Sequence, residues 1–259
     1  MNYTNEDIIH VKKEDIEYLQ FRKLLDYGIV HAYVLKKYNR NYRVLNDNYS
    51  EVMDNYKYLF KCLNLDSCNL IRAKQIHSDI INVVDNKISF ESIEGDALIT
   101  REKGYILSTI NADCILFLLY DKANHVIANV HSGWRGTLKR IIIKTINRMN
   151  DLYNTDPSNV ICCICPCIHK CHFEVDEDVY ILFKNEFKDM AIDKLISHKN
   201  NKWYIDTVGI NKVLLERLGL IKDNIIDSNI CSVCNSDYIN SYRIQGIDTM
   251  EGTAIIYLQ

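Results

Sequence analysis

The sequence lacks the features that mark membrane, secreted and multidomain proteins. Nowhere in its 259 residues is there a run of the roughly 18 to 20 apolar residues that a membrane-spanning helix needs. The first twenty residues are charged throughout and contain no apolar core of the kind found in signal peptides. Only 2 prolines and 9 glycines occur, and we find neither a linker-like segment nor an internal repeat. We therefore expect a cytoplasmic protein with one domain, residues 1–259, that does not contact membranes.

Nucleotide and nucleic-acid signatures are also missing. No Gly-x-Gly-x-x-Gly follows an apolar run, and no Gly-Lys-Ser/Thr is present, so dinucleotide and Walker-type sites are unsupported. The 31 basic and 34 acidic side chains give a net charge of −3 with no basic stripe, which argues against a nucleic-acid partner. Nothing suggests an extended apolar interface, so we expect a monomer.

Hydrophobic periodicity predicts both helices and strands. Apolar residues recur with helical spacing in four segments, of which the first can begin after Ser50 and the last between Asp206 and Gly219: 52–63, 138–149, 175–187 and 206–218. Short apolar runs of strand length lie between them: 80–84, 97–100, 105–110, 115–120, 126–130, 160–164, 239–244 and 253–258. Because several of these runs occur in succession before a helix follows, the order predicts an α+β fold with a mixed sheet.

Three short segments each carry a metal-capable side chain at the edge of an apolar run. His77, Cys114 and His131 are 37 and 17 residues apart, so spacing alone is a weak signal. Two histidines and one cysteine can hold a catalytic zinc ion with an open fourth position, which lowers the pKa of bound water to about 7. The alternative is that the histidines are ordinary hydrogen-bonded residues and Cys114 is a small buried apolar group.

The segment HSGWRG, residues 131–136, has the composition of a ligand-binding turn. Two glycines flank Trp134 and Arg135 just before a predicted helix, where backbone amides can approach an anion. Arg135 adds a forked donor suited to phosphate, although a solvated arginine in a tight turn is an equal alternative. Asp113 could orient a metal-bound histidine, or it could serve as a turn residue.

Most of the 10 cysteines lie in two late segments. Cys231 and Cys234 form a Cys-x-x-Cys pair, which is half of a structural zinc site. The other half could come from an earlier group of side chains: Cys165, Cys167, Cys171 or His172. Core packing of reduced thiols is the simpler explanation for most of them.

Taken together, several segments resemble one family. KQIHSDII (74–81), INADCILFLL (110–119), ANVHSGWRGTLKR (128–140), CPCIHKCHFEV (165–175) and NSYRIQGIDTMEGTAIIYL (240–258) look like the laccase-domain family, formerly labelled multicopper polyphenol oxidases. The resemblance implies a multilayer α/β/α sandwich with mixed sheets, related to the cysteine-hydrolase toxin fold. It also implies a Zn²⁺ site at His77, Cys114 and His131. The implied activities are phosphorolysis of adenosine, inosine, guanosine and methylthioadenosine, and deamination of adenosine.

The sequence departs from the family pattern around this triad. Tyr56 stands where the family has an arginine, and the family's early Gly-Gly loop has no counterpart in residues 34–43. Ile244 replaces the second arginine of a C-terminal pair, and Cys165 replaces a glycine before proline. The metal ligands are thus kept while other pocket positions have changed.

Three hypotheses follow. The first is a zinc enzyme that binds a purine nucleoside and phosphate, with phosphate held by Arg135 and the helix start at 136–138. The second is an amidase or deamidase with Cys114 as nucleophile, His131 as base, and Asp113 or His77 as orienting group. The third is a non-catalytic, zinc-stabilised interaction domain. Copper oxidation ranks lowest, because the chain has only 8 histidines and no His-x-His.

Overall fold

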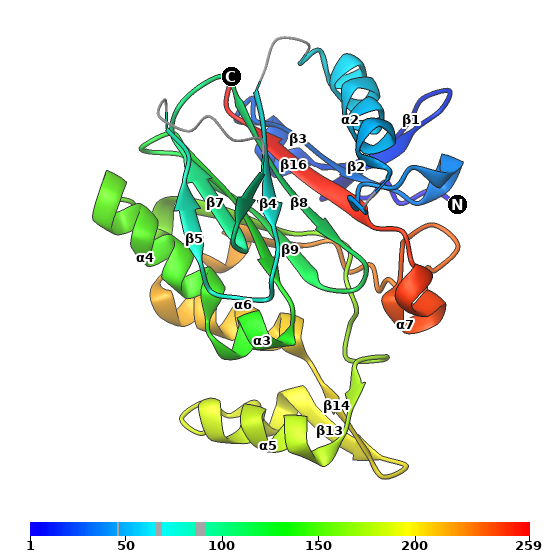
Figure 1. Ribbon diagram of the computed structural model, residues 1–259. Helices are drawn as coiled ribbons and strands as arrows, with labels where there is room; N and C mark the ends of the chain where they lie inside the picture. The colour runs from blue at the N-terminus through cyan, green and yellow to red at the C-terminus, as the bar shows by residue number, and fades with distance from the viewer. Residues whose placement is uncertain (46, 66–68, 86–91) are drawn as a thin grey trace.

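The computed structural model describes residues 1–45, 47–65, 69–85 and 92–259. Two stacked β-sheets form its centre, and helices cover their outer faces (Figure 1). Apolar side chains from both sheets share the core between them, including Leu98, Leu107 and Leu116. No helix in the described ranges is long and apolar enough to cross a membrane.

The first sheet has seven strands and mixes both pairing directions. In spatial order they are β1 (Ile8–Lys12), β2 (Glu17–Phe21), β3 (Val30–Val34), β16 (Gly252–Tyr257), β8 (Tyr105–Asn111), β4 (Asn69–Lys74) and β6 (Ser92–Glu94). Strands β4, β6 and β8 are parallel, whereas the other pairs are antiparallel. Strand β16, from the end of the chain, therefore lies between β3, from its N-terminal part, and β8, from its middle.

The second sheet has six strands and carries much of the candidate site. Its order is β15 (Ile225–Asp227), β11 (Val160–Ile164), β9 (Ile115–Asp121), β10 (Val126–Ser132), β7 (Ala97–Thr100) and β5 (Ile81–Val83). Strand β9 is buried along its whole length: Leu116 and Leu118 face the core between the sheets, while Phe117 and Leu119 face the helices. Burial on both faces explains why this strand is a continuous apolar run in the sequence.

Helices cover the outer faces of the two sheets. Helix α2 (Tyr49–Leu63) packs on the seven-stranded sheet through Val52, Tyr56 and Leu59. On the six-stranded sheet lie α3 (Trp134–Leu138), α4 (Ile141–Tyr153) and α6 (Thr207–Leu218). Two single-turn helices, α1 (Arg22–Leu25) and α7 (Tyr242–Gln245), complete this set.

A smaller unit projects from the sheets at the bottom of Figure 1. It consists of α5 (Glu177–Glu186) and a three-stranded sheet of β12 (Glu174–Val175), β14 (Lys202–Ile205) and β13 (Ile196–Lys199). Phe183 and Phe187 are fully buried in its core, which also contains Ile210 of α6. The projection is thus packed against the helices beneath the six-stranded sheet.

The predicted α+β fold with mixed sheets is confirmed. All four predicted helices form, and α6 has the expected ends: Asp206 Oδ1 accepts from the Gly209 amide at 2.8 Å, and Gly219 ends the helix with φ of 109°. Helix α2 begins at Tyr49 rather than after Ser50. The prediction of a strand at residues 239–244 is wrong, because this segment turns and enters α7. The single domain and the kinship with the cysteine-hydrolase fold stay predictions.

Candidate active site

Three side chains from distant parts of the chain meet at one end of the stacked sheets. His77 lies in the loop after β4, Cys114 lies between β8 and β9, and His131 is near the end of β10. Cys114 Sγ is 3.8 Å from His77 Nε2, and the two imidazole rings are nearly perpendicular with centroids 5.0 Å apart. All three donor atoms lie within 4.8 Å of one another. The convergence that the resemblance implied is therefore present.

The donor set fits a zinc ion. Bonds of about 2.0–2.1 Å to nitrogen and about 2.3 Å to sulfur place tetrahedral N and S ligands about 3.6 Å apart, close to the 3.8 Å between His77 Nε2 and Cys114 Sγ. Gly133 borders this space, and a Cβ there would lie 2.8 Å from His77 Cδ2 and 3.2 Å from Cys114 Sγ. Glycine is thus needed in HSGWRG because the backbone passes directly against two of the three candidate ligands.

Asp96, just before β7, orients two of the candidate ligands. Its Oδ1 is 2.8 Å from His131 Nδ1, which leaves Nε2 of that ring available to a metal. The same carboxylate accepts from the His77 amide at 3.1 Å and from the amide and hydroxyl of Ser78 at 2.7 and 2.6 Å. Burial raises the pKa of Asp96, but the hydrogen bonds from His131 and Ser78 have the larger effect and lower this pKa to about 2. No local motif links Asp96 to His131, so the sequence alone does not predict this residue.

Asp113 does not have the orienting role that was considered for it. Its carboxylate accepts from Ser232 Oγ at 2.5 Å and from the Arg243 amide at 2.7 Å. It therefore joins the β8–β9 connection to the C-terminal loops, while Asp96 holds His131. With φ of 89°, Asp113 turns the chain in a way that its closeness to Cys114 in sequence does not reveal.

The charges around the triad support a thiolate. Burial raises the pKa of Cys114, but nearby His131 and His77 lower it more, to about 7. Burial lowers the pKa of His131, but Cys114 and Asp96 raise it more, to about 9. A sulfur that deprotonates near neutral pH is suited both to metal binding and to nucleophilic attack.

A cavity of about 760 Å³ opens over the triad. This volume lies in the range of small-molecule sites. Besides the triad, the cavity is lined by basic side chains and aromatic rings from β4, α3, α7 and two loops: Arg43, Arg72, Lys74, Arg243, Trp134, Phe173 and Tyr242. The site therefore offers cations and flat apolar surfaces beside the candidate metal ligands.

Arg135 is not among the residues that line the cavity. Its side chain is exposed, with the guanidinium carbon 4.0 Å from the centre of the Trp134 ring. Arg72 of β4, by contrast, lines the cavity and is only 9% exposed. Within the described residues, no carboxylate forms an ion pair with Arg72.

The departures from the family pattern occupy different surroundings. Tyr56 is fully buried, donates or accepts hydrogen bonds with Ser108 at 2.7 Å and Thr253 at 3.2 Å, and its ring lies 5.8 Å from the Arg72 guanidinium carbon. Tyr56 is therefore not itself in the cavity lining, but it contacts Arg72, which is. Cys165 is buried in the core between the sheets, and Ile244 is 56% exposed.

The chain is similar to several known proteins. Residues 27–259 match the family model "Multi-copper polyphenol oxidoreductase laccase". A purine nucleoside phosphorylase of Clostridium acetobutylicum is 34% identical over 78% of this chain and 81% of that protein. A purine nucleoside phosphorylase of Bacteroides thetaiotaomicron is 37% identical, but the alignment covers only 59% of this chain and 56% of that protein. Adenosine deaminase RL5 of an unknown prokaryotic organism is 28% identical over 79% and 81%.

The fold is also similar to a solved structure. The Bacillus licheniformis hypothetical protein YfiH superimposes with a TM-score of 0.86 at 20% identity, over 96% of this chain and 99% of that one. At this identity the likeness concerns the fold alone. The family model, by contrast, spans most of the sequence, including all three candidate ligands. The chain therefore belongs to the multi-copper polyphenol oxidoreductase laccase family.

Proposed function

We propose that the protein is a zinc-dependent enzyme that cleaves purine nucleosides with phosphate and deaminates adenosine. The observation that carries the proposal is the meeting of His77, Cys114 and His131 in the wall of a cavity large enough for a nucleoside. The names of the relatives support the choice of substrate. The donor set, two imidazoles and one thiolate, supports zinc over the copper of the family's label.

A zinc ion held by the triad would act as a Lewis acid and activate water near neutral pH. The protein's own groups prepare the site for this. Asp96 fixes the tautomer of His131 and, through its backbone contact, the position of His77. Gly133 keeps the space between His77 and Cys114 free of side-chain atoms.

Phosphorolysis forms a bond from a phosphate oxygen to the anomeric carbon of the ribose and breaks the bond from that carbon to the base. Arg72 faces the cavity without a carboxylate partner among the described residues, so we assign it to the phosphate. Burial raises the pKa of Glu251 despite Arg43 at 3.7 Å, which suits this carboxyl to giving the departing base a proton. The rings of Phe173 and Tyr242 offer faces for the purine.

The proposal is tested with purified protein. Metal content is measured, and adenosine, inosine and methylthioadenosine are incubated with and without phosphate. Release of free base and ribose 1-phosphate reports phosphorolysis, and release of ammonia reports deamination. We expect Cys114→Ala to abolish both reactions and remove the triad's zinc, whereas the matched control Cys62→Ala, on α2, keeps both. Full turnover by Cys114→Ala would overturn the proposal.

A second candidate is favoured by one specific observation. Cys114, His131 and Asp96 are arranged in the order thiol, imidazole and carboxylate that a cysteine hydrolase needs. Asp96, rather than Asp113, would be the group that orients the histidine. His77, 3.8 Å from the thiol, has no evident role in such a mechanism but completes a metal site. Inactivation by iodoacetamide that added zinc does not slow, with hydrolysis of an amide substrate by metal-free protein, would support this candidate. Reversible loss of activity with a chelator would refute it.

A further inference from the structure

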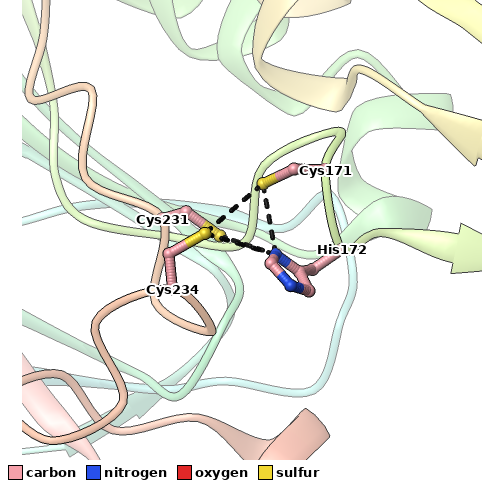
Figure 2. Close-up of side chains that lie close together, drawn as sticks. All are labelled: Cys171, His172, Cys231 and Cys234. Carbon is pink, nitrogen blue, oxygen red and sulfur yellow. Dashed lines mark hydrogen bonds between the residues drawn. The ribbon is translucent and has the colours of Figure 1, made fainter.

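A second group of metal-capable side chains lies apart from the triad. Cys171 and His172 follow β11, and Cys231 and Cys234 follow β15, so two loops contribute two donors each. Figure 2 shows the three sulfurs and His172 Nδ1 pointing toward one another. The four donor atoms lie within 4.8 Å of one another. Neither the proposed activity nor the family's metal triad uses any of them.

The structure shows which side chains lie beside the Cys-x-x-Cys pair of Cys231 and Cys234: Cys171 and His172. Cys165 and Cys167 are fully buried, and neither belongs to the group. Cys167 instead holds the two loops together through its backbone: its amide donates to Ile230 O at 3.2 Å and its carbonyl accepts from Ser232 at 2.9 Å. This pairing fixes the loops in the register that brings Cys231 beside His172.

The distances within the group match those of a tetrahedral zinc site. Zinc with bonds of about 2.3 Å to sulfur and about 2.0–2.1 Å to nitrogen sets ligand separations of about 3.8 Å between sulfurs and about 3.6 Å between sulfur and nitrogen. Cys171 Sγ and Cys234 Sγ are 3.8 Å apart. His172 Nδ1 lies 3.2, 3.7 and 3.4 Å from the sulfurs of Cys171, Cys231 and Cys234.

The group combines a buried ligand with exposed ones. Cys231 is only 6% exposed. Cys171 and Cys234 are exposed, so an ion can reach the group from solvent.

We propose that Cys171, His172, Cys231 and Cys234 bind a second, structural zinc ion. Four protein ligands fill the tetrahedron, so this site has no open position for a substrate, unlike the triad. Its effect is to pin two loops that wall the cavity: Phe173 follows one pair of ligands, and Arg243 lies on the segment after the other. Arg243 continues the link, since its guanidinium donates to His172 O at 2.8 Å and Glu174 O at 3.2 Å.

The first test is metal stoichiometry by mass spectrometry on the full chain, after removal of loosely bound metal. We expect two zinc ions per chain in the unaltered protein. Cys234→Ser and Cys114→Ser should each retain one, the double variant none, and the control Cys62→Ser two. One zinc in the unaltered protein that Cys114→Ser removes and Cys234→Ser leaves in place would overturn the proposal.

The second test does not depend on a folded Cys234→Ser. Cys114→Ser keeps the four-residue group intact, so X-ray absorption at its zinc edge should show three sulfur ligands near 2.3 Å and one nitrogen near 2.0–2.1 Å. A chelator should lower the melting temperature of this variant and release its remaining ion. A spectrum with oxygen and nitrogen ligands only, or a disulfide between Cys171 and Cys234 in the protein purified under air-free conditions, would refute the site.

Discussion

Replacing Asp96 with asparagine should weaken zinc binding at the triad by 10- to 100-fold. Oδ1 of the carboxylate accepts from His131 and the His77 amide, while Oδ2 accepts from the amide and hydroxyl of Ser78. An asparagine amide has only one oxygen, so in either orientation its NH₂ group faces donors that have lost their acceptor. Losing a hydrogen bond that orients a metal ligand typically costs 10- to 100-fold in metal affinity, or about 1.4–2.7 kcal/mol.

The affinity is measured by competition with a chromophoric chelator, and folding is followed by thermal unfolding of the metal-free protein. Ser78→Ala removes one donor to the same carboxylate and should give a smaller loss. Asp79→Asn is the control, because Asp79 pairs with Lys144 at 2.6 Å and makes no bond to the triad. A folded Asp96→Asn that binds zinc as tightly as the unaltered protein would refute the assignment of Asp96.

Three further predictions concern the cavity and the core. Gly133→Ala should reduce zinc content and turnover, since its Cβ would lie 2.8 Å from His77 Cδ2; unchanged zinc content by mass spectrometry would contradict this. Arg72→Ala should raise the KM for phosphate at least tenfold, or about 1.4 kcal/mol, while Arg135→Ala should leave it unchanged; the reverse pattern in steady-state kinetics would restore Arg135. Burial lowers the pKa of His31 in the folded protein to about 4, below its ordinary value of 6.5. The folded state is therefore destabilised as the pH falls from 6.5 toward 4, because in this range only the unfolded chain takes up the proton. Denaturant unfolding should show a loss of up to about 3 kcal/mol over this interval that His31→Gln reduces.

Local pattern was sufficient for the buried centre of the fold. The runs at 97–100 and 160–164 coincide with β7 and β11, because strands buried on both faces are apolar at every position. The N-terminal strands were missed. β1 contains the buried polar residue His10 and the exposed Lys12, and its structure depends on pairing with β2 rather than on its own sequence.

The candidate site was predictable only in part. The triad was predicted from the family resemblance, because the spacing of His77, Cys114 and His131 does not by itself indicate that they meet. Asp96 acts 35 residues before His131, and only the pairing of β7 with β10 brings them together. The sequence near a turn does not show which way a side chain points, and Arg135 here lies over the Trp134 ring. The cavity's cations come from β4, from the loop before α2 and from α7, so no local motif contains them.

The three candidate ligands of the triad do not have equal freedom to move. His131 belongs to a strand that is buried along its length, and Cys114 directly precedes another. His77 is exposed, lies in a loop with φ of 57°, and is held mainly through its amide. An arriving ion would therefore be bound first by Cys114 and His131, and His77 on the exposed loop would complete the site. The rate of ion exchange should accordingly follow the opening of this one loop, while the rest of the protein stays folded.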